Sequence, residues 1–440
     1  MSRKILTGKT AGTALGLAAG LMMAQNAAAL ELGTFNDTTF SIGGYVKADA
    51  TYTDRTNRAA NDANESFTVP ALIPLDGAQD SDNVTRYSIR ETRINFGTST
   101  PSRLGTVRTF IEMDFLEERD LARSRLVGNS TPRIRHAFIS VGPWLVGQTW
   151  GTFYDVSSLP EALDFIGPVG TIFNRNLQLR YTHDLGMGNN LMFALEQPFT
   201  TLVAEDSLGS QSSIVIDPET GAPVATESAV IAEGGALRSG RDDRFPDVVI
   251  RYNTSGDWGN GSLAVMGRNI RADRSSSREA GVDVDDDKWG AAASLSGNVN
   301  VVGKDTFKFQ FNVGNAIGRY ISLNAFPDAF VNEDGRLDLL DIYGGFVGYQ
   351  RWWTDRTRSN LIYSYVEANN PSSAPDAANE SIQSVHVNLI HSPIERLDVG
   401  IEYLWAERNI EGRVNRADGR SGTVSSGDMS RVQVSAKYSF

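Results

Sequence analysis

Hydrophobic and polar residues alternate with a period of two along most of the chain. In TFKFQFNVG (306–314), Phe307, Phe309 and Phe311 share one parity, and the polar residues between them take the other. This alternation is typical of a β-strand with one apolar face. The same pattern recurs in segments 106–115, 176–182, 190–196, 397–405 and 432–440. Because helical periodicity is scarce, the pattern predicts an all-β protein.

The connections between the predicted strands alternate between short and long. The short ones include residues 100–105, 142–143, 185–188, 302–305, 354–355 and 392–396. The long ones are residues 54–83, 117–131, 151–174, 198–244, 272–286, 317–341, 368–379 and 409–428. Tight turns at one end and long extracellular loops at the other, joining about 16 strands, are typical of outer-membrane β-barrels.

A soluble β-sandwich also alternates, but the aromatic residues favour the membrane barrel. Many of them lie near strand ends, where amphipathic rings occupy the two bilayer interfaces. These residues are Trp144, Trp289, Trp352, Trp353, Trp405, Tyr45, Tyr52, Tyr181, Tyr252, Tyr349 and Tyr438. An even strand number also brings 432–440 next to 40–53, so that no backbone edge is left in lipid. The sequence therefore predicts a 16-stranded antiparallel transmembrane β-barrel.

The first 29 residues differ from the rest of the chain. Arg3, Lys4 and Lys9 precede the apolar run 13–24, and three alanines at 27–29 offer a cleavage site, which predicts a secretory signal peptide. The apolar run is well short of the roughly 20 residues that span a bilayer, which argues against a retained membrane anchor. Residues 30–440 then form one barrel domain, exported through the periplasm to the bacterial outer membrane.

The composition excludes several classes of protein. The formal net charge is −12, which argues against a nucleic-acid partner because nucleic acids bind basic surfaces. The chain has no cysteine and so does not depend on disulfides. After residue 30 no apolar stretch approaches about 18 residues, so a membrane protein built of helices is excluded.

If the apolar parity faces lipid, the opposite parity lines the lumen, and this wall is rich in arginine. The predicted pore-lining residues are Lys47, Arg93, Arg108, Glu112, Asp114, Arg133, Arg135, Arg180, Arg251 and Lys308. Arg133 and Arg135 are included although segment 133–142 shows no clear parity. Guanidinium forks match carboxylates, and rings of charge set pore selectivity, so the wall favours small anionic solutes. The alternative is an unselective porin whose mixed charges only hydrate the lumen.

The third long loop, 151–174, is unusually apolar. It carries Phe153, Tyr154, Leu159, Leu163, Phe165, Ile166 and Phe173. Folding into the barrel would bury these side chains and constrict the pore; packing at a subunit contact is the alternative. Inside the barrel, Asp155, Glu161 and Asp164 are expected to face the arginines of the second to sixth strands and to create a transverse field.

The chain resembles the DcaP-like outer-membrane porins over most of residues 30–440. The segments that carry the resemblance are 92–102, 107–115, 133–138, 146–170, 177–182 and 349–365, and the most specific is GQTW (147–150) leading into a loop with LDF and GP. The resemblance implies a homotrimeric porin for small organic anions, above all dicarboxylates. It places Arg93, Arg133, Arg135 and Arg180 in the pore. The periplasmic coiled coil of some members is not expected, because few residues separate the predicted cleavage site from the first strand.

The chain end resembles the signature that the barrel-assembly machinery reads in outer-membrane proteins. Tyr438 and the terminal Phe440 carry this resemblance. The other predicted partners are outer-membrane lipid and lipopolysaccharide.

No catalytic constellation is present in the sequence, so no enzyme, cofactor or metal site is predicted. The four histidines, His136, His183, His386 and His391, do not have zinc-site spacing, and no serine lies in a G-x-S-x-G motif. Asp283, Asp285, Asp286 and Asp287 are interpreted as a solvated acidic loop rather than a calcium site. A structural or adhesin barrel is the remaining alternative function.

Overall fold

The computed structural model describes most of the chain. The described residues are 30–54, 56–57, 68–77, 80–81, 83–116, 131–204, 236–238, 243–272, 284–416 and 420–440. The predicted signal peptide, residues 1–29, lies outside the described residues. Within the described ranges, no helix is long and apolar enough to cross a membrane.

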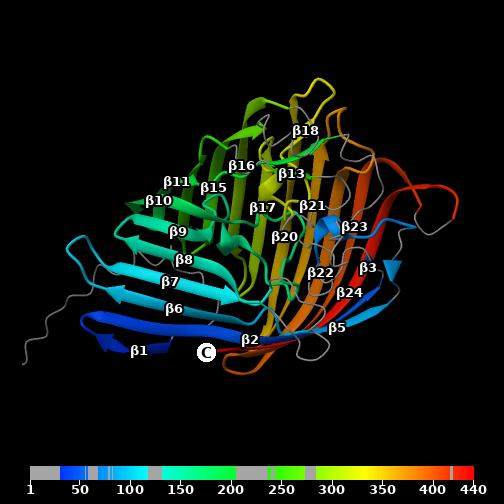
Figure 1. The fold of residues 1–440 in the computed structure, drawn as a ribbon. Helices are drawn as coiled ribbons and strands as arrows, with labels where there is room; N and C mark the ends of the chain where they lie inside the picture. Colours follow the sequence, from blue (N-terminus) through cyan, green and yellow to red (C-terminus); the bar gives the residue numbers. More distant parts are fainter. Residues whose placement is uncertain are drawn as a thin grey trace, which may run out of the picture.

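Sixteen antiparallel strands form a closed barrel, which confirms the predicted fold (Figure 1). Each strand pairs with its neighbour in chain order. The strands are β2 (Thr38–Asp54), β6 (Arg93–Thr100), β7 (Val107–Asp114), β8 (Arg133–Val141), β9 (Trp144–Trp150), β10 (Arg175–Gly186), β11 (Asn189–Glu196), β14 (Asp247–Gly256), β15 (Gly259–Ala272), β16 (Asp286–Asn300), β17 (Thr306–Gly314), β20 (Asp341–Thr354), β21 (Thr357–Asn369), β22 (Asn379–Ile394), β23 (Leu397–Asn415) and β24 (Thr423–Ser439).

The barrel closes between its first and last strands. In Figure 1 the blue β2 lies beside the red β24, and the register pairs Tyr45 with Ser439. The backbone N–H of Phe440 donates to the carbonyl of Gly44 at 3.0 Å. The terminal strand is therefore paired up to its last residue, as a barrel in lipid requires.

Several short elements accompany the barrel strands. β1 (Leu30–Phe35) and β5 (Val84–Ser88) pair with the two ends of β2. β12 (Thr201–Ala204), β13 (Ala236–Arg238), β18 (Ala329–Val331) and β19 (Leu337–Leu339) form a small separate sheet, and β3 (Thr56–Asn57) pairs with β4 (Asp80–Ser81). The 3₁₀ turns are η3 (Pro70–Leu72), η4 (Val156–Ser158) and η7 (Gly318–Tyr320).

The two faces of the barrel wall follow the alternation of the sequence. On β17, Phe307 and Phe311 are 37% and 52% exposed on the outside, whereas Lys308 and Gln310 are buried on the inside. In a soluble sandwich the apolar side chains would be the buried ones. Apolar residues outside and polar residues inside are the arrangement that a surrounding bilayer stabilises.

A bulge on β8 explains why segment 133–142 shows no clear parity. Glu112 pairs with His136, and Met113 pairs with Ile134, so Arg135 has no partner across the strand pair. A bulge inserts one extra residue and reverses the parity beyond it. As a result Arg135 and His136 are both buried on the inner side, while Ile134 and Ile139 are exposed outside.

The last long loop is shorter than predicted. The prediction places it at 409–428, but β23 continues to Asn415 and β24 begins at Thr423. The extensions carry polar residues of both parities, for example Arg413, Ser425 and Ser426. Alternation is needed only where lipid and water meet opposite faces, so strands that extend beyond the bilayer carry no such pattern.

Three connections fold into the barrel and share a hydrophobic core there. They are residues 68–77, the loop 151–174 and the segment 315–340, which contribute Ile73, Phe153, Ile172, Tyr320 and Phe326 to one buried cluster. The cluster also contains inner-wall residues such as Val249, Ile342 and Leu404. The prediction that loop 151–174 folds inside the barrel is confirmed; the constriction of the pore by this loop stays a prediction.

Candidate functional site

Loop 151–174 follows much of the inner wall before it returns to β10. Its backbone N–H groups donate to wall side chains: Leu163 to Glu402 on β23 at 2.8 Å, Gly170 to Ser364 on β21 at 2.7 Å, and Ile172 to Gln310 on β17 at 2.9 Å. Each bond fixes a backbone donor that would otherwise be unpaired in a buried place. The loop is therefore pinned to the half of the barrel formed by β16 to β24.

The close packing around Gly170 allows the attachment of the loop to the wall to be tested. A Cβ atom at Gly170 would lie 2.6 Å from the carbonyl oxygen of Gly345 and 2.7 Å from that of Tyr365. The substitution Gly170→Ala is therefore expected to push the loop inward, at a cost of about 1–3 kcal/mol, and to reduce single-channel conductance. Gly267→Ala is the control because nothing lies within 4 Å of its Cβ position. Equal conductance in both variants would contradict the pinning.

The three loop carboxylates lie against a different part of the wall from the one predicted. Asp155 accepts a hydrogen bond from Ser296 on β16 at 3.0 Å. Glu161 forms an ion pair with Arg358 on β21 at 2.5 Å, and Asp164 forms one with Arg431 on β24 at 3.3 Å. The expected field between these acids and the arginines of the second to sixth strands, β6 to β10, stays a prediction, because the acids contact β16, β21 and β24 directly. The loop runs along the opposite wall before its tip reaches the arginines.

The arginines of β6 and β8 surround two buried carboxylates of β7. Arg135 forms ion pairs with Glu112 at 2.8 Å and with Asp114 at 2.7 Å. Arg133 forms one with Asp114 at 2.9 Å, while Arg93 lies 3.9 Å from Glu112. Arg93 makes no hydrogen bond to the described residues, and its Nε is buried without an acceptor.

Aromatic rings contact these arginines from the loop side. Phe165, at the loop tip, has its ring centroid 5.9 Å from the guanidinium of Arg93 and 5.6 Å from that of Arg135. Tyr45 lies 5.2 Å from Arg93, and Trp150 lies 5.6 Å from Arg135. Cations are attracted to the faces of such rings. The loop thus presents an aromatic ring, and not a carboxylate, to the arginine wall.

Arg175 joins this cluster although the sequence interpretation omitted it. Its guanidinium lies 4.9 Å from the Trp150 ring and 5.4 Å from the Phe173 ring, and one terminal nitrogen is buried without an acceptor. Arg175 shares the parity of the exposed Leu177 and Leu179, so alternation placed it outside. It is the first residue of β10, where the chain leaves the loop and its side chain can still turn inward.

Three other predicted pore-lining cations form no direct ion pair with a carboxylate among the described residues, although Glu196, Asp155 and Glu161 lie close enough to act on their charge. Arg180 makes no hydrogen bond, and its Nε is buried without an acceptor. Arg251 donates to the carbonyl oxygens of Thr152 and Tyr154 at 3.2 and 2.6 Å, and Lys308 donates to that of Leu159 at 2.9 Å. These three side chains carry positive charge along β10, β14 and β17.

The remaining two predicted cations, Lys47 and Arg108, lie on the inner sides of β2 and β7. Lys47 is buried on the inner side of β2 between Asp49, at 3.5 Å, and Glu91, with which it forms a close ion pair. Arg108 is half-buried on β7, two residues along the inner parity from Phe110.

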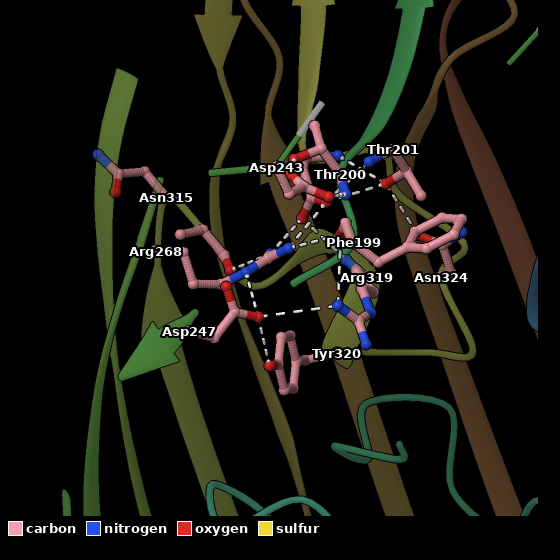
Figure 2. A network of polar contacts seen from close by, with 12 residues as sticks. Phe199, Thr200, Thr201, Asp243, Asp247, Arg268, Asn315, Arg319, Tyr320 and Asn324 are labelled. Carbon is pink, nitrogen blue, oxygen red and sulfur yellow. Dashed lines mark hydrogen bonds and ion pairs between the residues drawn. The ribbon is translucent and has the colours of Figure 1, made fainter. Parts of the chain in front are cut away.

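A second polar network fixes the segment 315–340 inside the barrel (Figure 2). Arg268 on β15, only 1% exposed, forms ion pairs with Asp247 at 3.0 Å and Asp328 at 2.7 Å. The Tyr320 hydroxyl donates to Asp247 at 2.7 Å. Burial raises the pKa of Tyr320 well above its ordinary value, so the hydroxyl keeps its proton and remains a donor. This network holds the segment, although Oδ1 of Asp247 is buried without a hydrogen-bond partner among the described residues.

Among the described residues, no group of three or more His, Asp or Glu side chains is arranged to hold a metal ion.

Comparison with known proteins assigns the chain to a family. The family model described as DcaP outer membrane protein matches residues 11–203 and 216–438. No curated protein sequence matches. The outer membrane channel DcaP of Acinetobacter baumannii is similar in structure, with a TM-score of 0.71 at 22% identity over 93% of this chain and 99% of that one.

Other solved porins share the fold. OmpT of Vibrio cholerae has a TM-score of 0.53 at 11% identity, over 93% of this chain and 100% of that one. An anion-selective porin from Comamonas acidovorans has a TM-score of 0.50 at 10% identity, over 92% and 100%. The family match covers nearly the whole barrel, and these structures share its architecture. The chain therefore belongs to the DcaP outer membrane protein family and is a porin of the bacterial outer membrane.

Proposed function

We propose that this porin passes small hydrophilic solutes by passive diffusion and prefers organic anions such as dicarboxylates. The observation that carries the proposal is an imbalance of charge inside the barrel. Five inner cations have no hydrogen-bonded carboxylate partner among the described residues: Arg93, Arg175, Arg180, Arg251 and Lys308. Positive groups that are not neutralised internally attract anions in a narrow, partly desolvated passage.

The inner carboxylates do not offset these cations to the same degree. Glu161 and Asp164 are ion-paired with Arg358 and Arg431. Glu196 is buried and accepts hydrogen bonds from the Thr152 backbone at 2.5 Å and from Asn176 at 2.6 Å. A carboxylate occupied in this way attracts mobile cations less than a free one.

The pore-lining assignment of the ten predicted residues forms part of this proposal. All of them lie on the inner parity of their strands, and Asp155, Glu161 and Asp164 lie on the loop inside the barrel. Two comparisons are consistent with the preference for anions. One similar porin is described as anion-selective, and the family resemblance implies dicarboxylates.

We also infer a homotrimer that contacts lipid and lipopolysaccharide and is inserted by the barrel-assembly machinery through Tyr438 and Phe440. One OmpT structure is described as a trimer form, which supports the trimer. On the outer face of β2 and β24, Ala48 and Ala436 are small, so another barrel can approach closely there. Mass measurement of the detergent-purified protein tests the trimer; a monomer mass would contradict it.

Bilayer and liposome measurements test the selectivity. Under a salt gradient the reversal potential is expected to shift toward the equilibrium potential of the anion. In a liposome swelling assay, succinate is expected to enter faster than succinamide, its uncharged analogue of similar size. Equal entry rates would favour an unselective porin, a cation-directed reversal potential would contradict the anion preference, and absence of conductance would favour a structural or adhesin barrel.

A further inference from the structure

We propose that Phe165 positions the guanidinium groups of Arg93 and Arg135 and thereby determines how strongly the passage prefers anions. This proposal rests on the proposed anion-preferring function and assigns part of that preference to an uncharged side chain.

The Phe165 ring lies between elements that the sequence keeps far apart. Its centroid is within 6 Å of the guanidinium carbons of Arg93 on β6 and Arg135 on β8, at 5.9 and 5.6 Å. It also contacts Phe173, with the ring centroids 5.9 Å apart and the planes at 74°. Phe165 thus connects two arginines of the wall to the returning leg of its own loop.

The chain just before Phe165 is tied to the barrel wall and to the segment 68–77. The backbone N–H groups of Leu163 and Asp164 donate to Glu402 at 2.8 and 3.1 Å, and Lys47 donates to the Leu163 carbonyl at 2.9 Å. The Asp164 carboxylate accepts the backbone N–H of Thr68 at 2.9 Å. A tip held from several strands keeps the ring at a fixed place in the passage.

The Phe165 ring reduces the repulsion between the two guanidinium groups without accepting hydrogen bonds from them. Two guanidinium groups near one another repel, and the negative face of an aromatic ring attracts both. A carboxylate would also attract them but would accept their N–H groups and cancel their charge. The Arg93 side chain is 20% exposed and makes no hydrogen bond to the described residues, so its exposed N–H groups can bind the carboxylate of a solute, while its Nε is buried and Glu112 lies 3.9 Å away.

A purely steric role for Phe165 makes different predictions. If the ring only narrowed the passage, leucine would leave the preference for anions unchanged, because the two side chains are both large and apolar. Under the positioning role, leucine removes the aromatic face and allows the arginines to separate. Tryptophan keeps an aromatic face and should rescue the function.

The test compares Phe165→Leu and Phe165→Trp with the unmodified porin in planar bilayers and in the swelling assay. Phe165→Leu is expected to lower the ratio of succinate to succinamide entry by about two- to fivefold and to move the reversal potential toward zero, while Phe165→Trp retains both. Phe153→Leu is the matched control. Phe153 is a buried ring of the same loop and contacts Tyr320, with the ring centroids 6.1 Å apart. The substitution Phe153→Leu should leave the entry ratio unchanged.

The outcomes separate this proposal from the proposed function. An unmodified porin without anion preference contradicts the function and this assignment together. An anion preference that survives in Phe165→Leu contradicts only the role of Phe165. An equal change in Phe153→Leu and Phe165→Leu assigns the effect to loop packing and also overturns it.

Discussion

Replacing Arg93 and Arg175 together by glutamine is expected to remove most of the preference for succinate over succinamide. Both guanidinium groups are held by aromatic rings and lack hydrogen-bonded carboxylates in the described chain, so their charge is available to a solute. A hydrogen bond to a charged group contributes about 1.5–3 kcal/mol, so each arginine should change the ratio by about tenfold or more. Liposome swelling with succinate and with succinamide measures the ratio of their entry rates.

The control for this pair is an arginine outside the passage. Arg351 lies on the outer parity of β20, is about half exposed and forms an ion pair with Asp305. The variant Arg351→Gln should leave the ratio unchanged. If the Arg93 and Arg175 variant loses succinate and succinamide entry equally, the passage has collapsed, and the charge argument is contradicted.

The variant Arg268→Ala is expected to be the most destabilising single change considered. Arg268 is buried between Asp247 and Asp328; its loss removes the ion pair of Asp328 and leaves Asp247 with Arg319, 3.7 Å away. Asp247, Arg268 and Arg319 are labelled in Figure 2. Breaking a buried ion pair from one side costs about 3–5 kcal/mol. The free energy of unfolding, measured by urea denaturation of the protein in phospholipid vesicles, should fall by about this amount.

A surface ion pair provides the comparison for Arg268. Lys304 and Asp355 lie 2.7 Å apart on neighbouring tight turns, with side chains 57% and 90% exposed. Such exposed pairs are screened by water and contribute little, so Lys304→Ala should change the stability little. Similar losses in Arg268→Ala and Lys304→Ala would contradict a special stabilising role for the buried network.

The fold was predictable because the bilayer imposes its rule on each strand separately. Phe307 and Lys308 differ in exposure because Phe307 faces lipid and Lys308 faces the lumen. The apolar or polar character of each residue determines which side it faces. The pairing of β24 with β2 follows from the need to satisfy every backbone group in lipid. Even the inward folding of loop 151–174 could be inferred, since its apolar side chains need to be covered.

Some features of the site are not encoded by the alternation. The bulge at Arg135 changes the parity within one strand, and Arg175 lies at a strand end where parity no longer decides the direction of a side chain. The contacts of the loop acids are not encoded by the alternation either. In the folded protein Glu161 and Asp164 meet Arg358 and Arg431, which lie about 200 or more positions away in sequence.

The sequence by itself determined the barrel, the direction of its two faces, its closure and an interior rich in arginine. These properties depend on the period of the hydrophobic alternation and on the type of each residue, because lipid and water act on each side chain separately. The tertiary structure alone decided which inner charges are neutralised and that Phe165, rather than a carboxylate, meets Arg93 and Arg135. Those contacts depend on the path of a loop around the inner wall, and side chains distant in sequence meet there only after the barrel has closed.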